Sequence, residues 1–562
     1  MSKQNPEQNV GRRSLLAGAA AVAGGAALST ALPANAQAAP ASAVAAARPS
    51  TAALAAPVVV TPTDPRFPDL VRGNNMRWQA APERVVLVTT ADHAVSAVQE
   101  AVTAGKRLTV RSGGHCYEDF VFNNAVQVVV DLSAMNQIRF DPTHHAFEIE
   151  AGASNLDIYE KLYKLYGVTL PAGSCASVGV GGHISGGGYG LLSRLHGLTV
   201  DYLHGVEVVV VRNGTAQKVQ AFRNSPEQDL RDLWWAHTGG GGGNFGLITR
   251  YWLKKPGSTS TDPGQLLPRP PSEVLLQASA FKWADLTETS FTRLVQNWGT
   301  WHEQNSAPGS PYESLFGLLK LTHSGAGEIG LITQMDASVP NARQRLHEYL
   351  TAITAGVGVQ PTAMTQRMGE HAALTQFRSA RQLPWYIATD HLSGGNPGQY
   401  GKYKSSYARK PFSPAQIAAL HRNLYTTYRN PDGALVQVDS YGGRINAVPS
   451  ADTAVPQRDS IMKLQFQVYW TDPAQEALHL SWIRDLYQQM YAETGGVPVP
   501  NTINDGCYIN YPDKDLGDPA LNTSGTTWQT LYYKGNYARL QRAKSTWDPQ
   551  NFFRHAQSVR VP

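Results

Sequence analysis

Cysteine is scarce in this sequence, with only three residues in 562. Three is too few, and the wrong parity, for the disulfide framework on which small secreted folds depend. At least one thiol must therefore be free or bonded to another group, with a bridge between Cys116 and Cys175 as the alternative. The chain also contains no H-x-x-x-H or C-x-x-C pair, so we expect no metal site built on those spacings.

A strong excess of one charge is missing as well. The chain carries 48 Lys and Arg against 43 Asp and Glu, a net charge of +5. Outside the extreme N-terminus no dense basic block with interleaved aromatic residues occurs, so nucleic acid is not an expected partner. Hydrophobic residues make up 42% of the chain, which is ample for the cores of two lobes at this length.

The N-terminal residues do not resemble part of a fold. A pair of arginines, Arg12 and Arg13, leads an Ala- and Gly-rich apolar stretch, and a small-residue cleavage motif ends at Ala38. This pattern predicts a twin-arginine export signal over residues 1–38. A membrane anchor is the alternative, but the stretch is only weakly hydrophobic. We expect a mature protein that is secreted or otherwise extracytoplasmic, without stable membrane insertion.

Glycine, by contrast, is concentrated in particular places. Residues 171–190 hold a long glycine-rich run, and the shorter motif Arg111-Ser-Gly-Gly-His115 follows an apolar alternation typical of a strand. Glycine allows positive φ angles and a closer approach of the backbone to a ligand than other residues do. A strand that ends in an amide-rich turn is suited to holding phosphate oxygens. The two segments therefore predict two walls of one cofactor site.

A third glycine cluster, Gly239–Gly246, contains Gly241, Gly243 and Gly246 in a G-x-G-x-x-G pattern. A Rossmann loop joins a strand to a helix, whereas this cluster follows a predicted helix and enters a predicted strand. We therefore expect no NAD site here.

The remaining periodicities indicate an α+β protein with two lobes. Strand patterns are expected at residues 107–110, 126–132, 146–150, 206–211, 247–253, 315–321, 435–438 and 461–470. Helical spacing is expected at residues 90–105, 155–165, 229–238, 341–354, 414–428 and 535–547.

Five motifs in the order of the chain resemble the berberine-bridge-enzyme-like flavoprotein oxidases of the vanillyl-alcohol-oxidase superfamily. They are Arg111-Ser-Gly-Gly-His115, Gly173-Ser-Cys-Ala-Ser-Val-Gly179, Gly181-Gly-His-Ile-Ser-Gly-Gly-Gly188, Tyr508-Ile-Asn-Tyr-Pro-Asp513 and Trp547-Asp-Pro-Gln-Asn-Phe-Phe553. The resemblance covers roughly residues 64–562. Within the family, the resemblance extends to bacterial members of the aclacinomycin oxidoreductase and hexose-oxidase-like kind.

The resemblance implies a division of the chain after the signal. Residues 39–63 are interpreted as a linker, followed by a bipartite PCMH-type FAD-binding domain at 64–255. A substrate-binding domain with an antiparallel sheet covered by helices is expected at 272–500. The last segment, 501–562, is expected to return to the FAD-binding domain.

The resemblance also implies FAD attached by two covalent bonds, from His115 to the flavin 8α-methyl group and from Cys175 to flavin C6. An imidazole nitrogen and a thiolate are both competent nucleophiles toward an electrophilic ring. Cys116 is a nearby competing thiol, but the family places its sulfur link in the later loop. The other implied cofactor-binding residues are Arg111, Ser112, Gly113, Gly114, Val178, Gly179, Gly182, His183, Ser185, Gly188, Tyr189, Gly190, Tyr508 and Asn510.

By the same resemblance, Tyr511 is the base that takes the proton of a substrate hydroxyl while a hydride leaves for flavin N5. A phenol has a pKa of about 10, so it needs a nearby cation or hydrogen-bond donors to act near neutrality. Tyr441 resembles a second active-site tyrosine of bacterial relatives, and Tyr508 is the alternative for either role. Val178 stands three residues after Cys175, where relatives gate oxygen access, and valine there is typical of oxidases.

Together these features predict an exported FAD oxidase that acts on an alcohol of a sugar or glycosylated natural product and reduces O2 to H2O2. A dehydrogenase with another electron acceptor, or an enzyme of oxidative C–C bond formation, is the alternative within enzymes. A carbohydrate-binding protein without enzymatic activity is the alternative outside them. Such a protein would be colourless and would need neither His115, Cys175 nor the glycine-rich walls. The sequence makes no prediction about oligomeric state.

Overall fold

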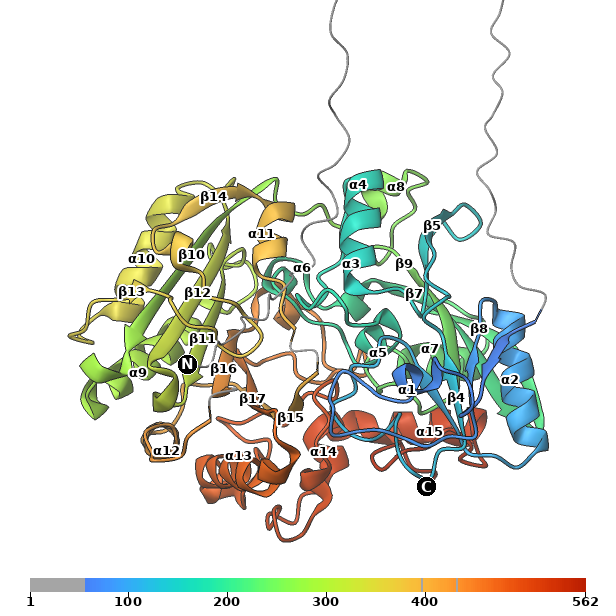
Figure 1. Ribbon diagram of the computed structural model, residues 1–562. Coiled ribbons are helices and arrows are strands. Elements are labelled where there is room, and N and C mark those ends of the chain that lie inside the picture. The colour runs from blue at the N-terminus through green and yellow to red at the C-terminus, as the bar shows by residue number, and fades with distance from the viewer. Residues whose placement is uncertain (1–55, 396–397, 431–432) are drawn as a thin grey trace, which may run out of the picture. The chain divides into compact units, whose positions relative to one another are not determined.

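The computed structural model describes residues 56–395, 398–430 and 433–562 (Figure 1). The predicted export signal and the first part of the predicted linker lie outside these residues. The described residues form three β-sheets with helices packed around them. This arrangement confirms the predicted α+β fold.

The first lobe contains two of the sheets. The four-stranded sheet has the order β1-β2-β4-β3, in which β1 is antiparallel to β2 and the other neighbours are parallel. The five-stranded sheet is antiparallel and has the order β5-β6-β9-β7-β8. The strands are β1 Val58–Val60, β2 Arg84–Leu87, β3 Leu108–Arg111, β4 Val128–Asp131, β5 Ile138–Asp141, β6 Ala146–Glu150, β7 Leu203–Arg212, β8 Thr215–Phe222 and β9 Leu247–Leu253.

The first strand corrects the predicted linker boundary. Val58–Val60 were placed in the linker 39–63, but they pair with β2 and extend the edge of the four-stranded sheet. Short β-branched segments gain their stability from a neighbouring strand, which a local composition pattern does not reveal.

The second lobe is built on an eight-stranded antiparallel sheet of order β13-β10-β12-β11-β16-β17-β15, with β14 pairing on β10. Its strands are β10 Glu273–Lys282, β11 Phe316–Thr322, β12 Glu328–Asp336, β13 Thr362–Ala363, β14 Arg381–Pro384, β15 Tyr400–Ala408, β16 Ala434–Ser440 and β17 Met462–Trp470. Side chains alternate between the two faces, so Gln437 and Asp439 share one face while Val436 and Val438 share the other. On the apolar face, Phe466 packs edge-on against Tyr487 of a covering helix.

Helices surround the sheets, and several begin at residues suited to cap them. The hydroxyl of Thr90 accepts a hydrogen bond from the amide of His93, and Ser413 forms a capping box ahead of Pro414. The longer helices are α2 Ala91–Thr103, α7 Gln228–Ala236, α9 Glu288–Asn305, α10 Ala342–Thr354, α11 Trp385–His391, α12 Pro414–Leu424, α13 Glu476–Met490 and α15 Tyr537–Trp547. The shorter ones are α1 Phe67–Leu70, α3 Asn155–Asp157, α4 Tyr163–Tyr166, α5 Val180–Ser185, α6 Ser193–His196, α8 Pro263–Leu266 and α14 Trp528–Tyr533.

The two lobes share one continuous hydrophobic core, which runs from Val86 to Val559. Helices α9, α10, α12 and α13 pack on one another and on the eight-stranded sheet. The last helix, α15, packs on α7 and β7 of the first lobe. The other face of the eight-stranded sheet is thereby left to line the candidate site.

Candidate active site

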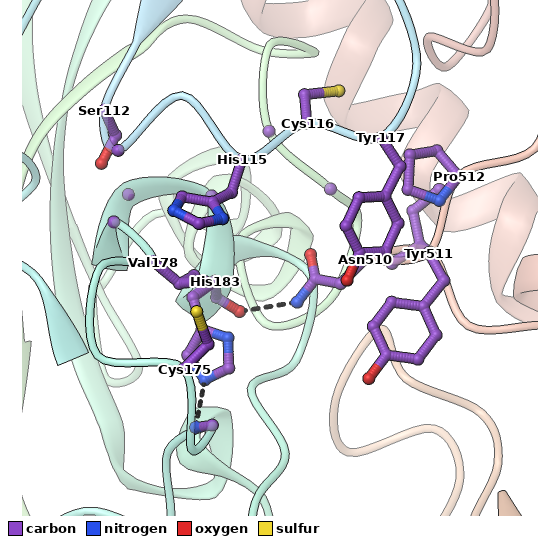
Figure 2. Close-up of a pocket in the computed structure, with 18 of the residues that line it drawn as sticks. Ser112, His115, Cys116, Tyr117, Cys175, Val178, His183, Asn510, Tyr511 and Pro512 are labelled. Atoms are coloured by element: carbon purple, nitrogen blue, oxygen red, sulfur yellow. Dashed lines mark hydrogen bonds between the residues drawn. The ribbon is translucent and has the colours of Figure 1, made fainter. Parts of the chain in front are cut away.

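The two glycine-rich segments predicted from the sequence meet at one cavity (Figure 2). A Cβ atom on Gly113 would stand 2.3 Å from the amide nitrogen of Gly179, and one on Gly179 would stand 2.2 Å from the amide nitrogen of Gly113. Such distances are shorter than atoms tolerate, so only glycine allows the two backbones to touch. Both segments therefore line one cavity, and its role as the predicted cofactor site stays a prediction.

His115 and Cys175 lie close together on these walls. The hydroxyl of Ser177 is 3.0 Å from Nε2 of His115 and 3.7 Å from Sγ of Cys175. All three cysteines of the chain are free thiols, so the alternative bridge between Cys116 and Cys175 is not formed. In Figure 2 the imidazole of His115 lies between these two cysteines.

Burial sets the protonation of the two side chains in opposite ways. It lowers the pKa of His115 to about 4, with a further contribution from Arg111. It raises the pKa of the Cys175 thiol above its usual value, and the carboxylate of Glu370 adds to this. At neutral pH His115 is therefore an uncharged imidazole with a free lone pair, whereas Cys175 must lose a proton before it can act as a nucleophile.

The turn after β3 presents backbone donors to the cavity. The amides of Gly113, Gly114 and His115 donate to no acceptor among the described residues, and Gly114 has a φ of +75°. A turn of this kind forms a concave group of N–H donors that binds anions such as phosphate. Nε of Arg111 is likewise buried without a partner in this part of the chain. The donor set fits the pyrophosphate of a dinucleotide cofactor.

Two further segments line the same cavity although sequence analysis did not assign them to it. One is the third glycine cluster, Gly241–Asn244, and the other is the C-terminal segment Phe553–His555. The ring of His555 stacks on Phe120 with ring centroids 4.2 Å apart. The cluster does not have the order of elements of a Rossmann loop. Its repeated glycines were therefore the only feature of the sequence that could have indicated a ligand-binding segment.

Hydrogen bonds hold the inner wall in place. Nε2 of His183 accepts from the amide of Gly173 at 3.0 Å, and the side-chain amide of Asn510 donates to the carbonyl oxygen of His183 at 2.9 Å (Figure 2). Asn510 also donates to the hydroxyl of Tyr508 at 3.0 Å. The turn that carries Tyr511 is thereby tied to helix α5, which begins in the long glycine-rich run.

Tyr511 lines the cavity beside a buried ammonium group. Nζ of Lys463 lies 4.0 Å from the centroid of the Tyr511 ring and 3.4 Å from a carboxylate oxygen of Asp439. Burial raises the pKa of Tyr511 well above its usual value, and the charge of Asp439 raises it further. Burial also lowers the pKa of Lys463 to about 8, so this lysine is still a cation at neutral pH. Its position over the ring favours the phenolate and opposes the effect of burial.

The floor of the cavity is the polar face of the eight-stranded sheet. Antiparallel register places Gln437 between Lys320 and Gln465, and pairs Asp439 with Lys463. Nζ of Lys320 donates to the side-chain oxygen of Gln437 at 2.7 Å, and the Gln437 amide donates to Asp439 at 2.8 Å. Sequence analysis missed these residues, because strands far apart in the chain bring them together.

Most of the predicted site residues line the cavity, and three do not. Tyr441 is fully buried and its hydroxyl donates to the carbonyl oxygen of Gln457. The hydroxyl of Ser185 donates to backbone carbonyls of its own helix, and Gly188 packs against Thr199. Those that line it are Arg111, Ser112, Gly113, Gly114, His115, Cys175, Val178, Gly179, Gly182, His183, Tyr189, Gly190, Tyr508, Asn510 and Tyr511.

Metal-binding clusters and membrane-spanning helices are both absent from the described residues. Residues 56–395, 398–430 and 433–562 contain no group of three or more His, Cys, Asp or Glu side chains arranged to hold a metal ion. None of the helices in these same ranges is long and apolar enough to cross a membrane.

Comparison with known proteins identifies the family. Residues 82–220 match the model of an FAD binding domain, and residues 507–560 match the model described as berberine and berberine like. The chain is 46% identical to the aclacinomycin-N/aclacinomycin-A oxidase of Streptomyces galilaeus, over 98% of each chain. The chain belongs to the berberine-bridge-enzyme-like FAD-linked oxidases. This enzyme is therefore an FAD-dependent oxidoreductase, as the resemblance implied.

Other relatives of this oxidase support the same family. It is 36% identical to the hexose oxidase of Chondrus crispus, over 88% of this chain and 93% of the relative. Among solved structures, the glycopeptide hexose oxidase DBV29 complexed with teicoplanin is 45% identical, with a TM-score of 0.84 over 90% of this chain and 99% of that chain. The fold and the enzyme class predicted from the sequence are thus both confirmed.

Proposed function

We propose that this oxidase carries FAD bonded to His115 and Cys175, and that it oxidises an alcohol group of a sugar or of a glycosylated natural product. We further propose that O2 accepts the electrons and becomes H2O2. The placement of His115 and Cys175 on either side of one hydroxyl, at the rim of an anion-binding turn, carries the first proposal. The names of three relatives support a sugar alcohol as the substrate and O2 as the acceptor, since two are hexose oxidases and one is an aclacinomycin oxidase.

When bound, FAD supplies the hydride acceptor for this reaction. The turn Gly113–His115 would hold the pyrophosphate through its free amides. His115 and Cys175 would hold the ring system, and Gly241–Asn244 with Phe553–His555 would enclose the rest. This division follows from the groups present, because backbone amides suit phosphate oxygens whereas an imidazole and a thiol are nucleophiles toward the ring.

Tyr511 is the proposed base for the substrate hydroxyl. Its phenol would accept the hydroxyl proton as the carbon-bound hydrogen leaves, and the ammonium of Lys463 would stabilise the negative charge at the ring. Tyr508 lies next to Tyr511, with ring centroids 5.0 Å apart, and is the second candidate. Tyr441 would act through Tyr189, on which it packs at 5.5 Å, rather than on the substrate.

The sheet floor is the proposed binding surface for the substrate. Gln437, Asp439, Gln465 and Glu370 line the cavity, and their side chains include both donors and acceptors. A hydroxyl both donates and accepts, so a mixed array of this kind suits a polyhydroxylated ligand. The array explains why a sugar is a better candidate than an apolar alcohol.

Val178 lines the cavity three residues after Cys175, and its small side chain supports O2 as the acceptor. A dehydrogenase that uses another acceptor is the second candidate, and peroxide release separates the two. Export by the twin-arginine route is part of the same proposal, supported by the sequence of residues 1–38. A covalent cofactor would not be lost after export.

The first test is an absorbance spectrum of purified protein before and after acid precipitation, in the wild type and in His115→Ala, Cys175→Ala and the double variant. We expect yellow colour that stays in the pellet and is released only when both residues are replaced. Cys116→Ala is a matched control, because this thiol lines the same cavity and should leave both bonds intact. Flavin released by acid from the wild type would contradict the double attachment.

The second test measures H2O2 release with hexoses, glycosylated polyketides and glycopeptides as substrates. Tyr511→Phe should keep its covalent flavin and lose at least about 100-fold in the rate of flavin reduction. Flavin reduction without peroxide in air would favour the dehydrogenase. A colourless wild-type protein that binds sugars would instead favour the carbohydrate-binding alternative.

A further inference from the structure

A buried network of charges lies beside the residues that line the cavity. Lys402 and Lys404 are two positions apart on β15, so both side chains leave the same face of that strand, and each is 3% exposed. Three carboxylates, from Glu118, Asp513 and Asp515, surround the two ammonium groups. Nothing in the proposed reaction uses these groups directly.

Lys402 joins the two ends of the proposed active site. Its Nζ donates to Glu118 at 2.6 Å and to Asp513 at 2.7 Å. Glu118 follows His115 by three residues, and Asp513 follows Tyr511 by two. One ammonium group therefore fixes the spacing between the turn that carries the proposed flavin ligand and the turn that carries the proposed base.

Lys404 also forms ion pairs with carboxylates, but only with those of the C-terminal turn. Its Nζ donates to Asp513 at 2.8 Å and to Asp515 at 2.8 Å, and no contact joins it to Glu118 among the described residues. Arg484 adds two hydrogen bonds to Asp515, at 3.0 and 2.9 Å. Lys404 thus secures the C-terminal turn but not the turn of His115.

The charges in this network are matched. Burial acts to lower the pKa of Lys402, but Asp513 and Glu118 outweigh it and raise the pKa above the usual value. Burial likewise acts to raise the pKa of Asp515, but Lys404 and Arg484 hold it below its ordinary range. Lys402 and Asp515 therefore stay ionised, and removal of Lys402 leaves buried carboxyl groups without their partner.

We propose that Lys402 is a positioning residue that brings His115 into place for its bond to the flavin. This inference rests on the double attachment proposed above. The bond replaces one C–H of the 8α-methyl group with a C–N bond to the imidazole of His115. Two protons and two electrons leave, one proton from the imidazole and the rest from the methyl group, and O2 takes them up as H2O2.

The position of the His115 imidazole controls how fast this bond forms, because its protonation state is already suitable for attack. Burial keeps the imidazole neutral, so its lone pair is available. Tyr117 stands between His115 and Glu118 in the sequence. Its ring stacks on the ring of Tyr403 in β15, with ring centroids 3.6 Å apart. The chain after His115 is therefore anchored to β15 both by this stack and by Lys402. A displacement of about 1 Å slows a reaction between held groups by about 100-fold.

The test uses single-link backgrounds, so that each bond is measured alone. In Cys175→Ala only the histidine bond can form, and there Lys402→Met should lower acid-stable flavin per chain by about tenfold or more. In His115→Ala only the sulfur bond can form, and Lys402→Met should leave it unchanged. Lys404→Met is the matched control, because it removes a lysine of equal burial from the same strand without touching Glu118.

Two further variants distinguish loss of the ion pair between Lys402 and Glu118 from a general loss of stability. Lys402→Arg retains the cation and should restore the histidine bond, and Glu118→Gln should lower it as Lys402→Met does. Far-ultraviolet circular dichroism and urea unfolding of each variant establish that it is folded. If Lys402→Met itself does not fold, Glu118→Gln alone carries the test.

The outcomes separate this inference from the proposed function. If Cys175→Ala alone holds no acid-stable flavin, the histidine bond does not exist and both proposals are wrong. If that bond forms normally in Lys402→Met and Glu118→Gln, only the positioning role is wrong. Equal loss in Lys404→Met, or equal loss of both bonds, also overturns the positioning role, because it shows a general structural effect.

Discussion

Replacement of Lys544 by methionine should destabilise this oxidase strongly. The side chain is fully buried, and its Nζ donates to the carbonyl oxygens of Asn244 at 2.6 Å and Phe553 at 2.7 Å. It also donates to the carboxylate of Asp548 at 2.7 Å, and Asp548 is 1% exposed. All three protons of the ammonium group are therefore used. Methionine fills a similar volume but donates none of them.

The magnitude follows from what the substitution leaves behind. Asp548 becomes a buried carboxylate without its cation, and breaking a buried ion pair in this way costs about 3–5 kcal/mol. Two carbonyl oxygens lose a donor as well, which adds to the cost. Asp548 still accepts hydrogen bonds from the amides of Phe552 at 2.8 Å and Phe553 at 2.9 Å, and these bonds reduce the cost of leaving its charge unpaired. We expect the free energy of unfolding to fall by about 3–5 kcal/mol.

Urea unfolding followed by tryptophan fluorescence measures this change. Adding Asp548→Asn to Lys544→Met removes the uncompensated charge and should recover about 1–2 kcal/mol. Lys164→Met is the control, because Lys164 pairs with Glu160 at an exposed site and should cost less than about 1 kcal/mol. A loss below about 1 kcal/mol in Lys544→Met, or no recovery in the double variant, would refute the reasoning.

Three more predictions follow from the cavity and the core. Lys463→Met removes the cation over Tyr511 and should slow anaerobic flavin reduction, measured by stopped flow, by about 10–100-fold while covalent flavin is kept. Gly113→Ala forces apart the two glycine-rich walls and should abolish acid-stable flavin. Gly535→Ala is the control and should keep it, because a Cβ atom on Gly535 would meet no atom within 4 Å. Burial lowers the pKa of His237 to about 4. The folded state then binds fewer protons than the unfolded state between pH 4 and about 6.5, so stability falls as the pH drops through that window. His237→Gln should flatten the fall in the free energy of unfolding, measured by urea titration between about pH 7 and about pH 5, by at most about 1.4 kcal/mol per pH unit.

Local patterns predicted a large part of this fold. The strand at 247–253 and the helix at 341–354 coincide almost fully with β9 and α10, because their apolar spacing is read within one element. The expected helix at 155–165 is instead interrupted by a π-helical turn, Ile158–Leu162. Such a turn depends on tertiary packing, which spacing along the sequence does not record.

The candidate site was predicted only where motifs are contiguous. The walls around His115 and Cys175 are short local segments, so glycine content and residue type were enough to find them. Lys463 and Asp439 face each other through the register of β16 and β17, and no pattern in either strand specifies that register. Gly241 belongs to a glycine cluster whose order of elements does not fit a Rossmann loop, yet this residue lines the same cavity, because the fold brings it there from a distant part of the chain.

The residues that line the cavity come from segments far apart in the sequence, so its formation depends on long-range folding. Its lining begins at Leu108 and ends at His555, and the intervening residues come from both lobes. The proposed flavin cavity is therefore complete only when these distant segments have folded against one another. Enclosure of the cofactor then depends on the packing of Phe553–His555 as much as on the two glycine-rich walls.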